Sequence, residues 1–419
     1  MMERRSSASI LVMILLLSAA TNLHAQTRKP RQTLRDLEKR QESLFKDFER
    51  EVSDGKVQAW EWDERSSVIR LSAGEAAAAY RPADWEGEDL LALAELWLVA
   101  EDYARAADVY RAAINSDSRR KEVDGLDIRA RLAEVLIRSD QLDSAGAVMQ
   151  QLKKERSDDR VVMVALVGLY RELALALRDS GYQLRAADAA YDGYQLADVS
   201  KLIRIGSPQL IERVLRDQLS MGALYVALSE QMSRAKTAVD FDKTVRKFDF
   251  KEQTYLLDHY EKELAIARMI GKPAPGLKPG VAGDSIDPAS MRGKIVLLDF
   301  TATWCAPCAA AFPHWREFQS RFADRGFQIV GVTRLYGRTD KGIAESADDE
   351  LKALREYKKA NNLTYPYLVA ALDDVTNEER FGVDSIPTVV VIDREGIIRH
   401  VKRGIGDYRR LGRFIEKLQ

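Results

Sequence analysis

The chain has 419 residues, of which 46% are hydrophobic, and its 64 basic and 65 acidic side chains leave a formal net charge of −1. This length and this hydrophobic content are enough for two or three domains with hydrophobic cores. The charge balance excludes long-range attraction to nucleic acid or to an anionic membrane, so the many charged side chains are better assigned to solvated helix faces.

The first residues have the pattern of an export signal. Two arginines precede an apolar run over residues 10–20, and Ala25 is the small residue of a cleavage site. The run is shorter than the roughly 20 residues that cross a bilayer, and no cysteine follows it to carry a lipid. Residues 1–25 therefore predict a cleaved signal peptide and a periplasmic or otherwise exported protein. An uncleaved membrane anchor is the alternative.

Residues 26–87 predict one helix and a small hairpin. From Thr33 to Val52 the apolar side chains recur at helical spacing on one stripe. The stripe indicates a helix docked on its own domain, with a short coiled-coil dimer as the alternative. From Lys56 to Ser72, aromatic and branched residues lie on both sides of a polar stretch, which favours two short strands.

Residues 88–270 are rich in alanine and leucine and predict an all-helical domain. Three segments resemble one another, and a small residue after each turn recurs at Ala106, Ala145 and Ala186, at spacings of 39 and 41 residues. This resembles degenerate tetratricopeptide-like helical hairpins, and an irregular helical bundle is the alternative. Either arrangement offers an extended surface for a partner.

Residues 271–280 break the helical pattern, because three prolines and three glycines among them cannot continue a helix. This segment is the predicted linker, and residues 281–419 form the next domain. There, short apolar runs alternate with helical segments, which predicts an α/β fold whose sheet has parallel members covered on both faces. We expect strands at 295–300, 327–332, 386–393 and 396–401, the last two antiparallel, and helices at 309–322, 351–360 and 409–418.

Cys305 and Cys308 are the only two cysteines of the chain. A bridge across two residues closes too little chain to stabilise a fold, whereas such a pair cycles readily between dithiol and disulfide. A zinc site needs further ligands, and with no other cysteine and four scattered histidines we expect no metal. No other cofactor is expected either.

The region from about residue 270 to the C terminus resembles the exported bacterial thiol-disulfide oxidoreductases of the TlpA/ResA type, which are redoxin or AhpC/TSA-like proteins with a thioredoxin fold. The resemblance is carried by the segments IGKPAP, GKIVLLDF, ATWCAPC, FPH, FGVDSIPT and VIDREG. Two features depart from the family. Thr301 stands where the family often has tryptophan, and the polar stretch 334–349 is unusually long, as a lid or a partner-recognition insertion would be.

The motif and the resemblance imply roles for three residues. Cys305, at the start of a helix whose N–H groups and dipole favour an anion, would be the exposed nucleophile. Cys308, one turn later, would resolve the mixed disulfide. Asp299, buried beneath the pair with a raised pKa, would take the proton of Cys308. A strand-end aspartate satisfied by local hydrogen bonds is the alternative for Asp299.

The resemblance also implies a substrate-binding surface. Pro387 would be a cis-proline against the disulfide that leaves the neighbouring backbone free to pair with a substrate strand, with an ordinary edge-strand proline as the alternative. Trp304 would be an apolar platform for substrate, with a core residue as the alternative. The remaining expected substrate-binding residues are Ala306, Pro307, Ile386 and Thr388.

These features together predict an enzyme, an exported thiol-disulfide oxidoreductase that acts on protein thiols and disulfides. The expected direction is reduction, with electrons from a membrane donor and with the helical region selecting partners. Two alternatives remain. A thiol peroxidase of the peroxiredoxin type needs a threonine at the position of Ala302. A helical-repeat adaptor whose thioredoxin-like domain only binds would not need Cys305, Cys308, Asp299 and Pro387 intact.

Overall fold

The computed structural model describes residues 28–53, 57, 62–116, 122–123, 126–156, 159–196, 208–232, 234–246, 254–284, 291–404 and 408–419. The signal peptide predicted for residues 1–25 lies outside the described residues. Contacts divide the chain into two compact units. The first covers residues up to 176 together with 195–214, and the second covers 177–194 together with 215–419.

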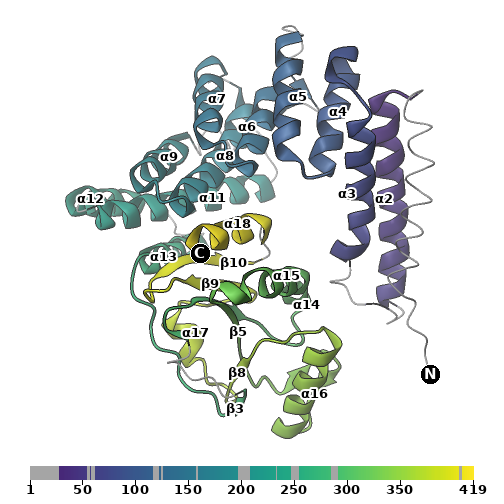
Figure 1. The fold of residues 1–419 in the computed structure, drawn as a ribbon. Helices are drawn as coiled ribbons and strands as arrows, with labels where there is room; N and C mark the ends of the chain where they lie inside the picture. Colours follow the sequence, from purple (N-terminus) through teal and green to yellow (C-terminus); the bar gives the residue numbers. More distant parts are fainter. Residues whose placement is uncertain are drawn as a thin grey trace, which may run out of the picture. The chain divides into compact units, whose positions relative to one another are not determined.

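The first unit is built mainly from consecutive helices joined by short connections (Figure 1). Leucine and alanine side chains fill the interfaces between neighbouring helices, as expected for amphipathic helices that bury one stripe. A two-stranded ribbon, β1 (Glu122–Val123) with β2 (Leu126–Asp127), precedes the third pair of helices. The helices are α2 (Pro30–Ser53), α3 (Trp62–Ala78), α4 (Gly87–Val99), α5 (Tyr103–Ser116), α6 (Ile128–Arg138), α7 (Leu142–Glu155) and most of α8 (Arg160–Asp179).

The helical hairpins predicted from the repeated segments correspond to α4 with α5 and α6 with α7. The small residues at the turns, Ala106, Ala145 and Ala186, are fully buried, which lets the backbones of adjacent helices approach closely. The helical class of this region is thus confirmed, and its assignment to a tetratricopeptide array stays a prediction.

The hairpin predicted for residues 56–72 is wrong over its described part, because the chain from Trp62 onward is helix α3. The buried residues Ile69, Ala73, Ala76 and Ala77 recur at helical spacing. The alternating pattern was confined to a few residues, and the alanine-rich continuation, which favours helix, decides the local structure.

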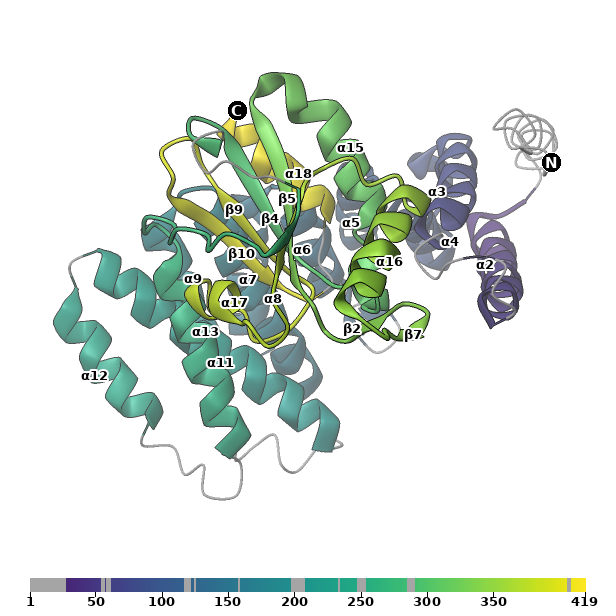
Figure 2. The same ribbon diagram turned by 90° about the horizontal axis from the view of Figure 1, so that it is seen from below.

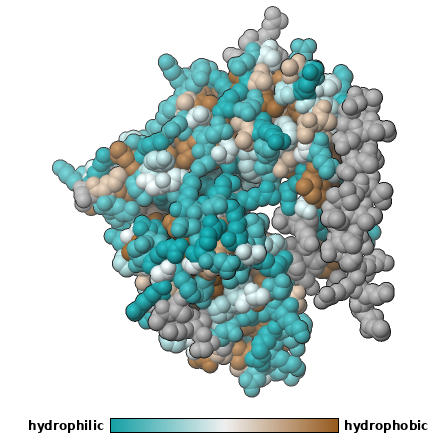
Figure 3. Space-filling model, in the orientation of Figure 1, coloured by the Kyte–Doolittle hydropathy of each residue, from teal (hydrophilic) through white to brown (hydrophobic). Residues whose placement is uncertain are grey.

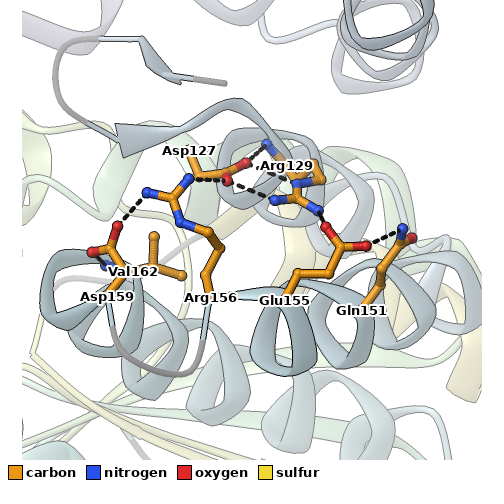
Figure 4. A network of polar contacts seen from close by, with 7 residues as sticks. All are labelled: Asp127, Arg129, Gln151, Glu155, Arg156, Asp159 and Val162. Carbon is orange, nitrogen blue, oxygen red and sulfur yellow. Dashed lines mark hydrogen bonds and ion pairs between the residues drawn. The ribbon is translucent and has the colours of Figure 1, made fainter. Parts of the chain in front are cut away.

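A buried ion-pair network fixes the turn between α7 and α8 to the start of α6 (Figure 4). Asp127 caps α6 by accepting a hydrogen bond from the backbone N–H of Arg129 at 2.9 Å. The same carboxylate pairs with the Arg129 guanidinium at 2.8 Å and with the Arg156 guanidinium at 3.1 Å. The two arginines also contact Glu155 and Asp159. Asp127, although buried, is therefore held between two guanidinium groups.

The second unit begins with helices and ends with a mixed sheet. The strand order is β10-β9-β4-β5-β8-β3, in which β4, β5 and β8 are parallel and the other neighbours are antiparallel. The strands are β3 (Ala282–Gly283), β4 (Ile295–Phe300), β5 (Phe327–Arg334), β8 (Tyr367–Ala370), β9 (Thr388–Ile392) and β10 (Ile398–Arg403). The helices of the unit are most of α9 (Gln183–Leu196) and α11 (Pro208–Gln231), then α12 (Ala235–Arg246), α13 (Thr254–Met269), α14 (Ala306–Ala309), α15 (Phe312–Phe322), α16 (Ala347–Ala360), α17 (Thr376–Arg380) and α18 (Tyr408–Leu418).

Helices cover both faces of the sheet (Figures 1 and 2). Val296, Leu298 and Phe300 of β4 share one core with residues of α13 and with the segment after α17. The alternate residues of β4 point to the other face, where Asp299 meets α15. Helix α13 was assigned from the sequence to the helical region, yet its Ile266 lies in the core of the sheet domain.

The α/β class and the thioredoxin-type sheet predicted from the sequence are confirmed. All four expected strands and all three expected helices are present, although the expected helix 309–322 is interrupted at Ala310 and Ala311, and Pro313 lies in the first turn of α15. Strand β8 was missed, since four buried residues after a proline give only a short apolar run. On the face drawn in Figure 3, hydrophilic residues predominate among the coloured atoms, in keeping with the high charged fraction.

Candidate active site

Cys305 occupies the N-cap of α14, directly after the loop that follows β4. The backbone N–H of Cys308 donates to Cys305 Sγ at 3.3 Å, so a donor is already aimed at the sulfur that would carry the thiolate. Helix α14 has only four residues, so its dipole is much smaller than that of the long helix expected from the sequence. The direct N–H contact is therefore the main local feature that favours an anion on Cys305.

Cys305 and Cys308 are joined by a disulfide, with their Cα atoms 5.3 Å apart, inside the usual range for such bridges. The expectation of an exposed nucleophile is wrong, because Cys305 is only 3% exposed. Trp304, Tyr336 and Ile386 pack against the two cysteines. Tyr336 belongs to the long polar stretch 334–349, and the sequence did not show that this stretch lies beside the cysteines.

Asp299, the penultimate residue of β4, is 1% exposed. Trp315 Nε1 donates to its Oδ2 at 3.1 Å, and the Tyr365 hydroxyl donates to the same oxygen at 3.3 Å. Burial raises the pKa of Asp299 to about 7, and these two hydrogen bonds act in the opposite direction. Among the described residues no lysine, arginine or histidine forms an ion pair with this carboxylate. Asp299 can therefore both release and accept a proton near neutral pH.

The hydroxyl that reaches Asp299 belongs to a stacked pair of buried tyrosines. The rings of Tyr365 and Tyr367 lie 5.4 Å apart and nearly parallel, and their hydroxyl oxygens are 3.5 Å apart. A Cβ atom at Gly331 of β5 would lie 2.7 Å from the Tyr367 ring, so a glycine is needed there. Sequence reasoning missed Trp315 and both tyrosines, since nothing in their local spacing points to Asp299.

The loop before β9 supplies the other side of the site. The peptide bond between Ile386 and Pro387 is cis. Ile386 packs against the disulfide, and the carbonyl of Pro387 accepts from Gly404 N at 2.8 Å. Thr388, expected to bind substrate, is buried and donates its hydroxyl to the Ser385 carbonyl at 2.7 Å, so it supports the loop instead.

The remaining expected substrate-binding residues lie around the disulfide. Ala306 and Pro307 are exposed, as a surface for a partner requires. Trp304 is half-buried, so it is neither a fully exposed platform nor a core residue. Its ring meets Tyr336 edge to face, with the ring centroids 5.1 Å apart. Thr301, where the family often has tryptophan, is buried, and its hydroxyl has no hydrogen-bond partner among the described residues.

The comparison with known protein families identifies the class of the C-terminal domain. Residues 269–409 match the Redoxin family, and these residues include the disulfide, Asp299 and the cis-proline loop. The C-terminal part of the chain is therefore a redoxin domain with a thioredoxin fold.

Several known proteins are similar to part of this chain. Protein DipZ of Mycobacterium tuberculosis is 28% identical over 195 residues, which are 46% of this chain and 24% of that protein. Thiol-disulfide oxidoreductase ResA of Bacillus thuringiensis is 26% identical over 150 residues, 36% of this chain and 78% of that protein. The chain thus spans about a quarter of the DipZ length. A putative thiol:disulfide interchange protein DsbE from Chlorobium tepidum has a solved structure that covers 36% of this chain and 96% of its own, with 24% identity and a TM-score of 0.29.

Proposed function

We propose that this protein is a thiol-disulfide oxidoreductase that exchanges the Cys305–Cys308 disulfide with thiols and disulfides of partner proteins. The observation that carries the proposal is the buried disulfide at the start of α14, shortly after strand β4, whose penultimate residue, Asp299, has a pKa of about 7. The packing of Ile386 against the disulfide and the similarity to proteins named thiol-disulfide oxidoreductases support it.

The exchange has two steps. In the reducing direction, the Cys305 thiolate attacks one sulfur of the partner's disulfide, and the other partner sulfur leaves as a thiolate. Cys308 then gives its proton to the Asp299 carboxylate and attacks the Cys305 sulfur. The mixed disulfide breaks and the partner's second sulfur leaves as a thiolate. The two partner thiolates take one proton from Asp299 and one from solvent, so the partner gains two electrons and two protons overall, and Cys305 and Cys308 form their disulfide. Asp299 suits this role because both of its protonation states are populated near its pKa of about 7.

Reduction of insulin by the purified chain with dithiothreitol tests the proposal. The wild-type chain should accelerate the reduction, Cys305→Ser should abolish the acceleration, and Cys308→Ser should accumulate a covalent mixed disulfide with insulin. An unaccelerated reaction with the wild-type chain would rule out the oxidoreductase. Turnover of hydrogen peroxide would instead favour a thiol peroxidase.

The direction of electron flow in the cell is proposed to be reduction, with a membrane donor that returns electrons to Cys305 and Cys308. Thioredoxin, a reductant, has a potential of about −270 mV, whereas the oxidant DsbA lies near −120 mV. A measured potential of the Cys305–Cys308 couple close to the DsbA value would contradict the proposed direction.

Export is proposed from the pattern of residues 1–25. Among the described residues, no helix combines the length and hydrophobicity that a membrane crossing requires. N-terminal sequencing of the chain recovered from its native host tests the proposal. A mature chain that begins near residue 26 supports cleavage and export, and a chain that retains residues 1–25 in the membrane fraction supports the anchored alternative.

Partner selection is proposed for the helical region. Its described helices expose several large apolar side chains, among them Tyr182 and Leu184 at the start of α9. The Cys308→Ser chain, which retains partners covalently, should trap a set of proteins in cells. Adding Leu184→Asp should reduce that set without changing insulin reduction by the chain with both cysteines. An identical trapped set would contradict a selecting role for this surface.

A further inference from the structure

We propose that residues 336–344, the site hairpin, form a docking wall beside the disulfide, and that Arg338 on this wall selects partner polypeptides with a carboxylate next to their reactive cysteine. The inference rests on the proposed thiol-disulfide exchange and adds the class of substrate. The hairpin comprises β6 (Arg338–Thr339) and β7 (Gly342–Ile343) and lies within the long polar stretch at 334–349.

The site hairpin is anchored at its base. The buried Glu350 carboxylate, in the first turn of α16, accepts hydrogen bonds from the backbone N–H groups of Tyr336 and Gly337, both at 2.8 Å. The N–H of Ala344 donates to the Gly337 carbonyl at 3.0 Å and closes the loop. Because a charged acceptor holds two backbone donors, the hairpin keeps a defined position beside the active site.

The anchored hairpin reaches the disulfide. Tyr336 packs against the cysteine pair together with Trp304 and Ile386. Cys305 is almost fully covered, and these side chains line an approach to it. A partner sulfur that takes this approach contacts the site hairpin.

Arg338 gives this wall a positive charge. Its guanidinium lies 4.5 Å from the centroid of the Trp304 ring, a cation–π arrangement that leaves the N–H edge available to a carboxylate. The neighbouring cations are already paired: Arg334 with Glu378 at 3.5 Å, and Lys341 with Glu356 at 3.1 Å. Among the described residues no carboxylate pairs with Arg338.

The position of Arg338 defines the partner. Trp304 precedes Cys305 in the chain, and Arg338 covers Trp304, so the guanidinium lies close to the path of the incoming cysteine. An extended polypeptide advances about 3.3 Å per residue. A glutamate or aspartate one or two residues from the partner's cysteine is therefore the group that fits Arg338, in a bidentate pair.

The test uses the full-length chain, reduced and freed of reductant, with two disulfide-linked peptide dimers. The dimers are identical except for glutamate or lysine next to the cysteine. One peptide disulfide is reduced to two peptide thiols while Cys305 and Cys308 form their disulfide, so each reaction balances. The ratio of the two rate constants, measured by chromatography after acid quenching, cancels general effects of a substitution on reactivity.

We expect the wild-type chain to prefer the glutamate dimer by about three- to five-fold at low salt, the range of a partly exposed ion pair. The preference should fall toward one at high salt, because screening shortens the reach of the charge. Arg338→Gln should bring the ratio to about one, and Arg338→Glu should reverse it. The matched control, Arg355→Gln, removes an exposed arginine from α16 outside the hairpin and should keep the wild-type ratio.

The neutral bis(2-hydroxyethyl) disulfide separates this inference from the proposed function. A wild-type chain that cannot reduce it fails as an oxidoreductase. A chain that reduces it but treats the two peptide dimers alike overturns the role of Arg338. The same holds if Arg338→Gln keeps the preference for glutamate or if Arg355→Gln removes it.

Discussion

Two fully buried aspartates, one in each compact unit, have opposite surroundings. Asp127 is 0% exposed and lies between the guanidinium groups of Arg129 and Arg156 (Figure 4). Asp299 is 1% exposed and receives only neutral donors, from Trp315 and Tyr365.

The difference separates a structural carboxylate from a reactive one. Paired cations offset the desolvation of Asp127, so its charge can be retained in the interior and used to cap a helix. No cation offsets the desolvation of Asp299, so its pKa rises to about 7 and its proton becomes exchangeable under ordinary conditions. Burial alone does not distinguish these two carboxylates, whereas the charge of the groups that contact them does.

The largest expected effect is on the stability of the first unit. Asp127→Ala leaves two partly buried arginines without their shared partner and removes the cap of α6, so the free energy of unfolding should fall by about 4 kcal/mol. Urea unfolding followed by far-ultraviolet circular dichroism measures the change. The matched control, Asp108→Ala, breaks an exposed pair with Arg111 and should leave the midpoint nearly unchanged. A small loss for Asp127→Ala would show that water replaces the carboxylate.

The second predicted effect is a rise in the free energy of unfolding. An aspartate in the unfolded chain has a pKa of about 3.9, whereas burial raises the pKa of Asp299 to about 7 in the folded chain. Between these pH values the folded state holds a proton that the unfolded state has lost, so stability falls as the pH rises and stays low above 7. Asp299→Asn removes this loss and should stabilise the chain by about 4 kcal/mol at pH 8.5, with little or no gain at pH 4.

Denaturant unfolding of the wild type and of Asp299→Asn at both pH values checks this prediction. A difference that does not depend on pH would mean that Asp299 does not titrate in the folded state. The same variant should slow the second step of exchange, since Cys308 would lose its proton acceptor.

The third effect concerns one hydrogen bond to Asp299. The Tyr365 hydroxyl lowers the pKa of this carboxyl, so Tyr365→Phe should move the midpoint of the pH–rate profile up by about one pH unit. Tyr367→Phe is the matched control, because its hydroxyl contacts the Tyr365 hydroxyl at 3.5 Å, whereas the hydrogen bonds to Asp299 among the described residues come from Trp315 and Tyr365. Equal shifts in the two variants would indicate a packing effect instead of a lost hydrogen bond.

Local patterns predicted most of the secondary structure, and they failed where the pattern was short or the contacts were distant. The apolar runs of β4 and β5 were long enough to identify as strands. The segment after Trp62 combined a brief alternation with an alanine-rich end, and helix α3 resulted. The prediction that Cys305 is exposed was wrong. One of the residues that cover it, Tyr336, lies more than thirty positions later in the chain and reaches the site only through the fold.

The sequence by itself determined the chemistry that depends on spacing: the two cysteines one turn apart, the strand-end Asp299 and the proline before β9. Such groups are adjacent along the chain or belong to a motif, so their relation is visible without a fold. Only the tertiary structure decided which donors meet Asp299, since Trp315 and Tyr365 come from a helix and a loop that follow it by 16 and 66 residues. It likewise decided that Arg338 lies over Trp304, because contacts between distant segments follow from sheet order and packing, not from spacing.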